Sequence, residues 1–117
     1  MLQKIETCVG TLLQQTSELA AKDGTASLPD VLTLEQDAWA VALAIGDYRR
    51  ERPDNVSPPE ETCEQAFQAF QRAGDTLAAL QRRHETLAPA CVRIRKNLAD
   101  LMRPLARRRP PSARTPA

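Results

Sequence analysis

The chain has 117 residues and a formal net charge of +1, a length that leaves room for one domain. Only four residues are aromatic, and Ala, Leu, Gln, Glu and Arg are abundant, which favours bundled helices over a β-sandwich. No run approaches the roughly 18 uninterrupted apolar residues of a membrane span, and the amino terminus lacks the basic-then-apolar layout of a secretory signal. We therefore expect a cytoplasmic protein with no membrane partner.

The small net charge hides a difference between two parts of the chain. Residues 1–80 carry 6 Lys and Arg against 13 Asp and Glu, whereas residues 81–117 carry 10 against 2. This asymmetry indicates either an acidic or nucleic-acid partner for the basic part, or internal pairing between helices that lie side by side.

The residues that could carry chemistry are few and scattered. The three cysteines, Cys8, Cys63 and Cys91, and the single histidine, His84, give neither a disulfide framework nor the ligand spacing of a zinc site. His84 and Cys91 lie two helical turns apart, too far for the hydrogen bond that would activate a nucleophile. We expect reduced, packed thiols, no metal or other cofactor, no catalytic residue, and a protein that is not an enzyme.

Two helices are predicted before residue 53. Apolar residues recur in alternating steps of three and four over 2–19 and again over 31–48, the spacing of helices with one buried stripe. Ser27 and Asp30 resemble a capping box at the start of the second helix, and Pro53 ends it. The second stripe is widened on one side by three further residues, Leu32, Trp39 and Ala42.

A longer seam with the same spacing covers residues 63–105. Ser57, followed by two prolines and Glu60, predicts the start of this third helix. Pro89 interrupts it at a cost of about 3 kcal/mol, because proline removes one backbone hydrogen bond and crowds the preceding turn. Since the seam stays in phase across Pro89, we predict a kinked, continuous helix; the alternative is a turn at Pro89 and a short fourth helix.

The predicted fold is all-α, an antiparallel three-helix bundle with a long, Pro-kinked carboxy-terminal helix. It forms a single domain over residues 1–106, and the Arg- and Pro-rich residues 107–117 are expected to be disordered. The first two helices are too short to cover the third beyond Pro89, which leaves a row of apolar residues that a soluble monomer does not normally expose. We predict that this row is the partner interface. It consists of Cys91, Ile94, Leu98, Leu101 and Leu105.

Basic residues surround this row and continue beyond it. We predict that they make the electrostatic contact with an acidic partner, choosing that partner and speeding the encounter. They are Arg93, Arg95, Lys96, Arg103, Arg107, Arg108 and Arg109. The last three also resemble a short nuclear-import patch, so the nucleus is the alternative location.

These features predict a non-enzymatic interaction protein, a small subunit or adaptor of a complex. It would pair through its carboxy-terminal helix with another helical protein or with a second copy. The short helix pair, the long amphipathic helix and the low aromatic content are similar to the small helical export chaperones of bacterial flagellar and type III secretion systems. This resemblance implies, as an alternative, transient binding of an aggregation-prone partner.

A nucleic-acid accessory protein that acts through the basic carboxy-terminal segment is the second alternative. The acidic first 80 residues argue against it, as does the absence of any aromatic residue after Phe70 to stack on bases. We therefore do not expect nucleic acid to be the partner.

Overall fold

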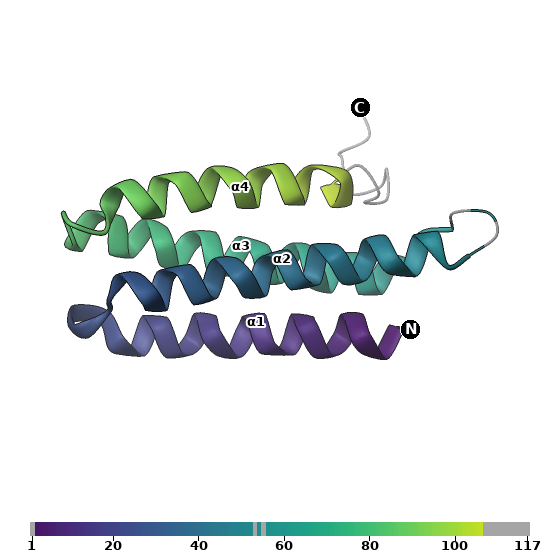
Figure 1. The fold of residues 1–117 in the computed structure, drawn as a ribbon, viewed down its shortest axis with the longest axis horizontal. Helices are drawn as coiled ribbons and strands as arrows, with labels where there is room; N and C mark the ends of the chain where they lie inside the picture. The colour runs from purple at the N-terminus through teal and green to yellow at the C-terminus, as the bar shows by residue number, and fades with distance from the viewer. Residues whose placement is uncertain (1, 53, 55, 107–117) are drawn as a thin grey trace, which may run out of the picture.

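The computed structural model describes residues 2–52, 54 and 56–106. This part of the chain is all-α, with no strand, and its four helices pack into a compact bundle (Figure 1). The helices are α1 (Leu2–Lys22), α2 (Leu28–Arg50), α3 (Glu60–Arg83) and α4 (Ala88–Ala106), with a 3-10 turn, η1 (Asp23–Thr25), after α1.

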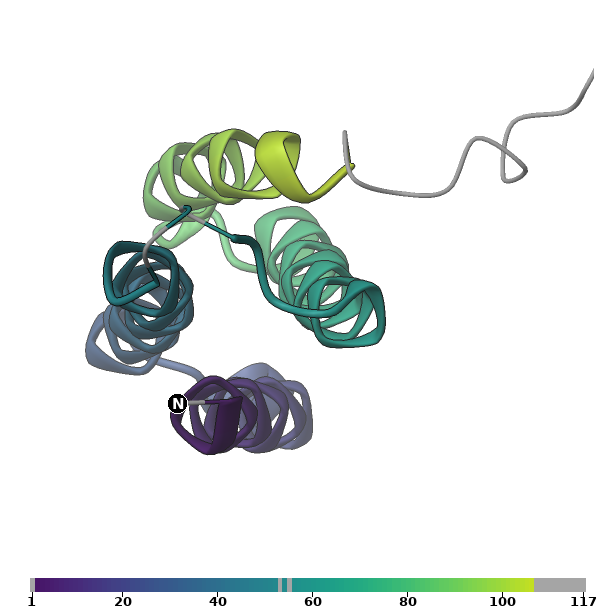
Figure 2. The ribbon, with the colours of Figure 1, turned by 90° about the vertical axis from the view of Figure 1, so that its right-hand side faces the viewer.

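The helices form two antiparallel hairpins, α1 with α2 and α3 with α4 (Figure 1). In the end-on view of Figure 2, α1 lies beside α3 and α2 lies beside α4, so α2 and α3 occupy opposite corners. The connection between α2 and α3 therefore crosses the end of the bundle. As a result, the two neighbouring pairs that are not hairpins, α1 with α3 and α2 with α4, run parallel.

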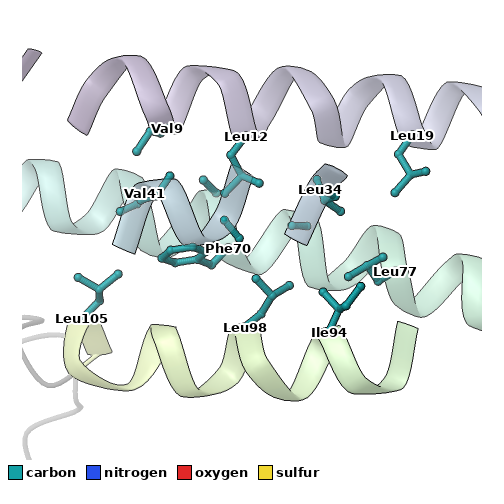
Figure 3. Packing of buried hydrophobic residues seen from close by; sticks show 14 of the residues in the cluster. Val9, Leu12, Leu19, Leu34, Val41, Phe70, Leu77, Ile94, Leu98 and Leu105 are labelled. Atoms are coloured by element: carbon teal, nitrogen blue, oxygen red, sulfur yellow. The ribbon is translucent and has the colours of Figure 1, made fainter. Parts of the chain in front are cut away.

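The predicted stripes of α1 and α2 form the core, as the spacing of their apolar residues predicted. The predicted α1 positions from Ile5 to Leu19 are buried, and Thr16, the one polar residue among them, donates a 2.7 Å hydrogen bond to the Leu12 carbonyl. Figure 3 shows side chains from all four helices meeting around Phe70, which is 1% exposed. A single hydrophobic core thus joins both hairpins.

The start of α2 follows the predicted capping box. The Ser27 backbone N–H and hydroxyl both donate to the same Asp30 carboxylate oxygen, each at 2.9 Å. Lys22 donates to the other oxygen of that carboxylate at 2.7 Å. Pro29 lies in the first turn, where a missing N–H leaves no helix bond unmade.

The predicted capping role of Ser57 at the start of α3 is wrong. The helix begins at Glu60 with Pro59 at the N-cap, in an extended conformation with ψ of 150°. Both Ser57 and Pro58 precede a proline, and such residues avoid the α region, so no helical turn can form before Glu60. The buried Ser57 hydroxyl has no hydrogen-bond partner within the described part of the chain.

The predicted continuous helix through Pro89 is also wrong, and the alternative, a turn and a fourth helix, is correct. Helix α3 ends at Arg83, and His84 takes an extended conformation with φ of −122° and ψ of 98°. Pro89 is then the second residue of α4. In the first turn its ring meets no preceding helical carbonyl and its missing N–H costs nothing, so Pro89 avoids the penalty of a proline in the helix interior. Pro104, by contrast, does lie inside α4.

Because α4 folds back on α3, the row expected to be uncovered is packed inside the chain. Cys91 and Ile94 are 0% exposed, Leu98 is 2% and Leu105 is 6%, while Leu101 is half-buried. Figure 3 shows Ile94 and Leu98 pointing from α4 toward Leu77 and Phe70. Burial in the chain's own core gives the hydrophobic free energy that the sequence assigned to a partner.

Candidate interaction surface

The basic residues predicted to contact a partner make bonds within the bundle instead, over most of α4. Arg95 donates to the Gln81 side chain at 2.8 Å, and Arg103 donates to Asp100 at 2.8 Å. Lys96 is exposed. The other three predicted residues, Arg107, Arg108 and Arg109, lie outside the described residues. The structure therefore does not bring the predicted row and the predicted charges together on one accessible face.

Arg93 makes the strongest of these bonds and ties α4 to α2. Its guanidinium donates to both carboxylate oxygens of Glu35, at 2.8 and 3.3 Å, and Asn97 donates to the same carboxylate at 3.1 Å. The Glu35 side chain is only 15% exposed. A bidentate arginine–carboxylate pair fixes the orientation of the two side chains as well as their distance, so it helps to set the position of α4 along α2.

The solvent-exposed side of α2 carries no charge over its first five turns. The carboxylates between residues 28 and 46 are all half-buried: Asp30 bonds Lys22, Glu35 bonds Arg93, and the buried Oδ2 of Asp37 has no hydrogen-bond partner among the described residues. We call the exposed residues of this stretch the uncharged face. They are Leu28, Pro29, Thr33, Gln36, Trp39 and Leu43.

Three large apolar side chains stand out on the uncharged face. Leu28 is 46% exposed, Trp39 is 45% exposed and Leu43 is 61% exposed. The sequence had assigned Trp39 to the widened core stripe, and the structure leaves a little under half of its surface in solvent. Exposed apolar groups that cluster on one helix are typical of a contact surface, whereas isolated ones are ordinary.

The uncharged face continues into a groove between α2 and α4. Ala42 and Gly46, one turn beyond Trp39 and Leu43, line one wall, and Leu101 and Pro104 line the other. The groove has a volume of about 190 Å³, and Phe70 lies at its base. Arg49 and Asp100 also line it and supply one charge of each sign. We call this depression the α2–α4 groove.

The three thiols lie on three different helices, α1, α3 and α4. Cys8, Cys63 and Cys91 are free cysteines; Cys63 and Cys91 are buried, as predicted for packed thiols, whereas Cys8 is half-buried. Burial raises the pKa of the Cys91 thiol, an effect that the nearby Arg95 partly opposes, so the thiol stays protonated at neutral pH. His84 ends α3, where its backbone N–H bonds the Leu80 carbonyl at 2.8 Å.

The described residues contain neither a metal-binding cluster nor a candidate membrane span. No group of three or more His, Cys, Asp or Glu side chains gathers there in a way that could hold a metal ion. None of the helices in this part of the chain is both long and apolar enough to cross a lipid bilayer.

Sequence reasoning missed the uncharged face although a signal was present. Apolar residues of α2 occur at Leu28, Trp39 and Leu43, outside the seam that runs from Val31 to Tyr48. A helix that is apolar around most of its circumference is one that buries more than one face.

Comparison of the chain with protein-family models, with curated proteins and with solved structures found no match.

Proposed function

We propose that this four-helix bundle is a non-catalytic interaction module, a subunit or adaptor, that binds a helix of another protein. The contact surface is the uncharged face of α2 together with the α2–α4 groove. The observation that carries the proposal is an exposed helical face of five turns with no charge and with Trp39 near its centre. Tryptophan at the centre of an apolar patch is the residue most often found to dominate binding energy.

The shape of the surface supports a helix as the occupant. The uncharged face spans residues 28–46, about 28 Å at 1.5 Å per residue, and the α2–α4 groove adjoins its carboxy-terminal end, where α2 lines it from Ala42 to Arg49. An apolar stripe on a partner helix would cover Trp39 and Leu43. One side of the groove is bordered by α4, whose exposed Lys96 has no ion pair in the described part of the chain. That border favours acidic residues on one flank of the partner helix.

The same contacts weigh against the nucleic-acid alternative. Arg93 and Arg103 each hold a carboxylate of this chain, so neutralising a phosphate would first require breaking an internal ion pair. The basic residues that remain on described α4 do not form a continuous stripe.

The experiment uses Trp39 itself, because it is the only tryptophan in the chain. The probe is a synthetic amphipathic peptide of about 20 residues, with leucines on one face and glutamates along one flank. Titration should shift the Trp39 emission to the blue, with saturation in the micromolar range. A second peptide with lysine in place of glutamate should bind several-fold more weakly.

Two variants distinguish binding at this surface from non-specific hydrophobic binding of the peptide. Leu43→Asp should remove binding of the acidic peptide, because it places a charge beside Trp39 on the uncharged face. Val92→Asp changes a side chain of α4 that is 51% exposed and lies outside the groove, and it should bind as the unaltered protein does. Equal binding by both variants, or equal binding of both peptides, would contradict the proposal.

A further inference from the structure

A second groove runs along the parallel pair α1 and α3. It consists of three depressions with volumes of about 350, 260 and 370 Å³. Neighbouring depressions share lining residues. The first and second depressions share Leu13 and Arg72, and the second and third share Asp75 and Thr76. The three depressions therefore form one continuous groove. The two helices that line this α1–α3 groove lie on the side of the bundle opposite α2 and α4 (Figure 2). The groove is thus separate from the proposed partner surface.

Packing within a single copy leaves room for a larger residue at one glycine of this groove. Gly10 lines the first depression, within α1. A Cβ built at Gly10 would meet no neighbouring atom within 4 Å, so packing within the chain does not require glycine there. Glycine inside a helix lowers its stability relative to alanine. Close approach of a second molecule would account for the missing side chain.

The charges that line the groove alternate in sign along its length. They are, in order from the amino ends of α1 and α3, Glu6, Arg72, Asp75 and Arg83. The first three have no ion-pair partner in the described part of the chain. Reading the groove from the opposite end gives the same sequence with every sign reversed. Such a pattern is complementary to itself when two copies meet antiparallel.

We propose that two copies of this chain associate through their α1–α3 grooves, about a two-fold axis that passes between Arg72 and Asp75. Each Arg72 then faces Asp75 of the second copy, and each Glu6 lies toward the Arg83 end of the other groove. A parallel arrangement would place like charges opposite each other. The charge order therefore selects the antiparallel dimer, and the two-fold axis makes the same contact twice.

The test is sedimentation equilibrium of the full chain over a concentration series up to about 1 mM, which detects even a millimolar dissociation constant. The unaltered protein should form a dimer. Arg72→Glu and Asp75→Arg should each raise the dimer dissociation constant by about tenfold or more, because each creates two like-charge contacts. Mixing these two variants should restore association as a heterodimer, since every contact is then attractive again.

The matched controls lie on α4, where Asp100 and Arg103 have the same three-residue spacing on an exposed surface. Asp100→Arg and Arg103→Glu should leave the dimer unchanged. A second variant, Gly10→Leu, should abolish the dimer while circular dichroism shows the helices intact. A monomer at every concentration would overturn the proposal. So would a dimer that is insensitive to Arg72→Glu and to Gly10→Leu, or a failure of the mixed variants to associate.

Discussion

The Glu35 carboxylate on α2 accepts hydrogen bonds from both terminal nitrogens of the Arg93 guanidinium on α4, at 2.8 and 3.3 Å. This pair is the main polar link between two helices that are far apart in the sequence. It joins the same two helices that line the α2–α4 groove.

Removing this link should weaken the bundle. We expect Glu35→Ala to lower the free energy of unfolding by about 1 kcal/mol, and a double-mutant cycle with Arg93→Ala to give a coupling of about 0.5–1.5 kcal/mol. The value is modest because half of the Arg93 side chain is exposed and water screens the pair. Urea denaturation of the single and double variants measures these changes in the free energy of unfolding. Arg103→Ala, which breaks an exposed pair, should change stability by less than about 0.5 kcal/mol; an equal loss in both would contradict this view.

The row on α4 should behave as core and not as interface. Leu98→Ala should cost about 2–5 kcal/mol, because Leu98 is 2% exposed and its loss leaves a cavity beside Phe70. Val92→Ala on the exposed side of the same helix should fall within about 0.5 kcal/mol of the unaltered protein. Thermal denaturation followed by circular dichroism distinguishes the two. A Leu98→Ala protein with unchanged stability would mean that α4 is not packed in the core.

Asp37 should oppose folding once it is ionised. Burial raises the pKa of its carboxyl above the usual 3.8, so the folded state holds the proton more tightly than the unfolded state does. The contribution of Asp37 to stability is therefore most favourable below pH 3.8 and falls as the pH rises through the raised pKa of this carboxyl. We expect Asp37→Asn to stabilise the protein at pH 7 by at most about 1 kcal/mol and to give no gain at pH 3. Urea denaturation at pH 7 and at pH 3 checks this. A gain in stability at pH 3 would mean that Asp37→Asn acts through packing and not through the removed charge.

Asp30 should show the opposite dependence. Its bonds from Lys22 and from Ser27 lower the pKa of the carboxyl to about 2. The stabilisation is therefore complete above pH 3.8 and is lost as the pH falls toward 2. Asp30→Asn should be less stable than the unaltered protein at pH 7, and the difference should vanish near pH 2. A difference that persists at pH 2 would show that the amide disturbs the turn in some other way.

The start of α2 gives a further test of the capping box. Ser27→Ala removes one hydroxyl bond to Asp30 but keeps the backbone bond, and we expect a loss of about 1 kcal/mol at pH 7. Thr33→Ala on the exposed side of the same helix is the control. A loss no larger than that of the control would mean that the hydroxyl contributes nothing at this helix start.

The helices, their buried stripes and the α2 start could be predicted because they depend on local information. A stripe spaced at three and four residues has to be buried somewhere. Ser27 caps α2 because the residues after it can enter the helix, whereas the consecutive prolines after Ser57 move the start of α3 to Glu60. The place of the break near Pro89 could not be predicted in this way. The seam keeps its phase through both a kink and a turn, so the choice depends on packing between α3 and α4, which is a property of the whole bundle.

The candidate surface was harder to predict from the sequence for a related reason. The side of α2 that meets solvent depends on which helices flank it, and the sequence does not give the order of helices around the bundle. Trp39 lies at the edge of the apolar stripe, where one more neighbouring helix would have buried it. Its exposure follows from α2 having α1 and α4 as flanking helices, with α3 across the core (Figure 2).

That order of helices has a consequence for valency. Since the helix pairs that line the α1–α3 and α2–α4 grooves lie on opposite sides of the bundle, a dimer joined at the first groove would carry two copies of the second, pointing away from each other. Two partner molecules would then bind without touching, at a ratio of one per chain, and neither would affect the affinity of the other. A target that displays two suitable helices on a flexible linker would gain avidity from effective concentration alone, with no new contact.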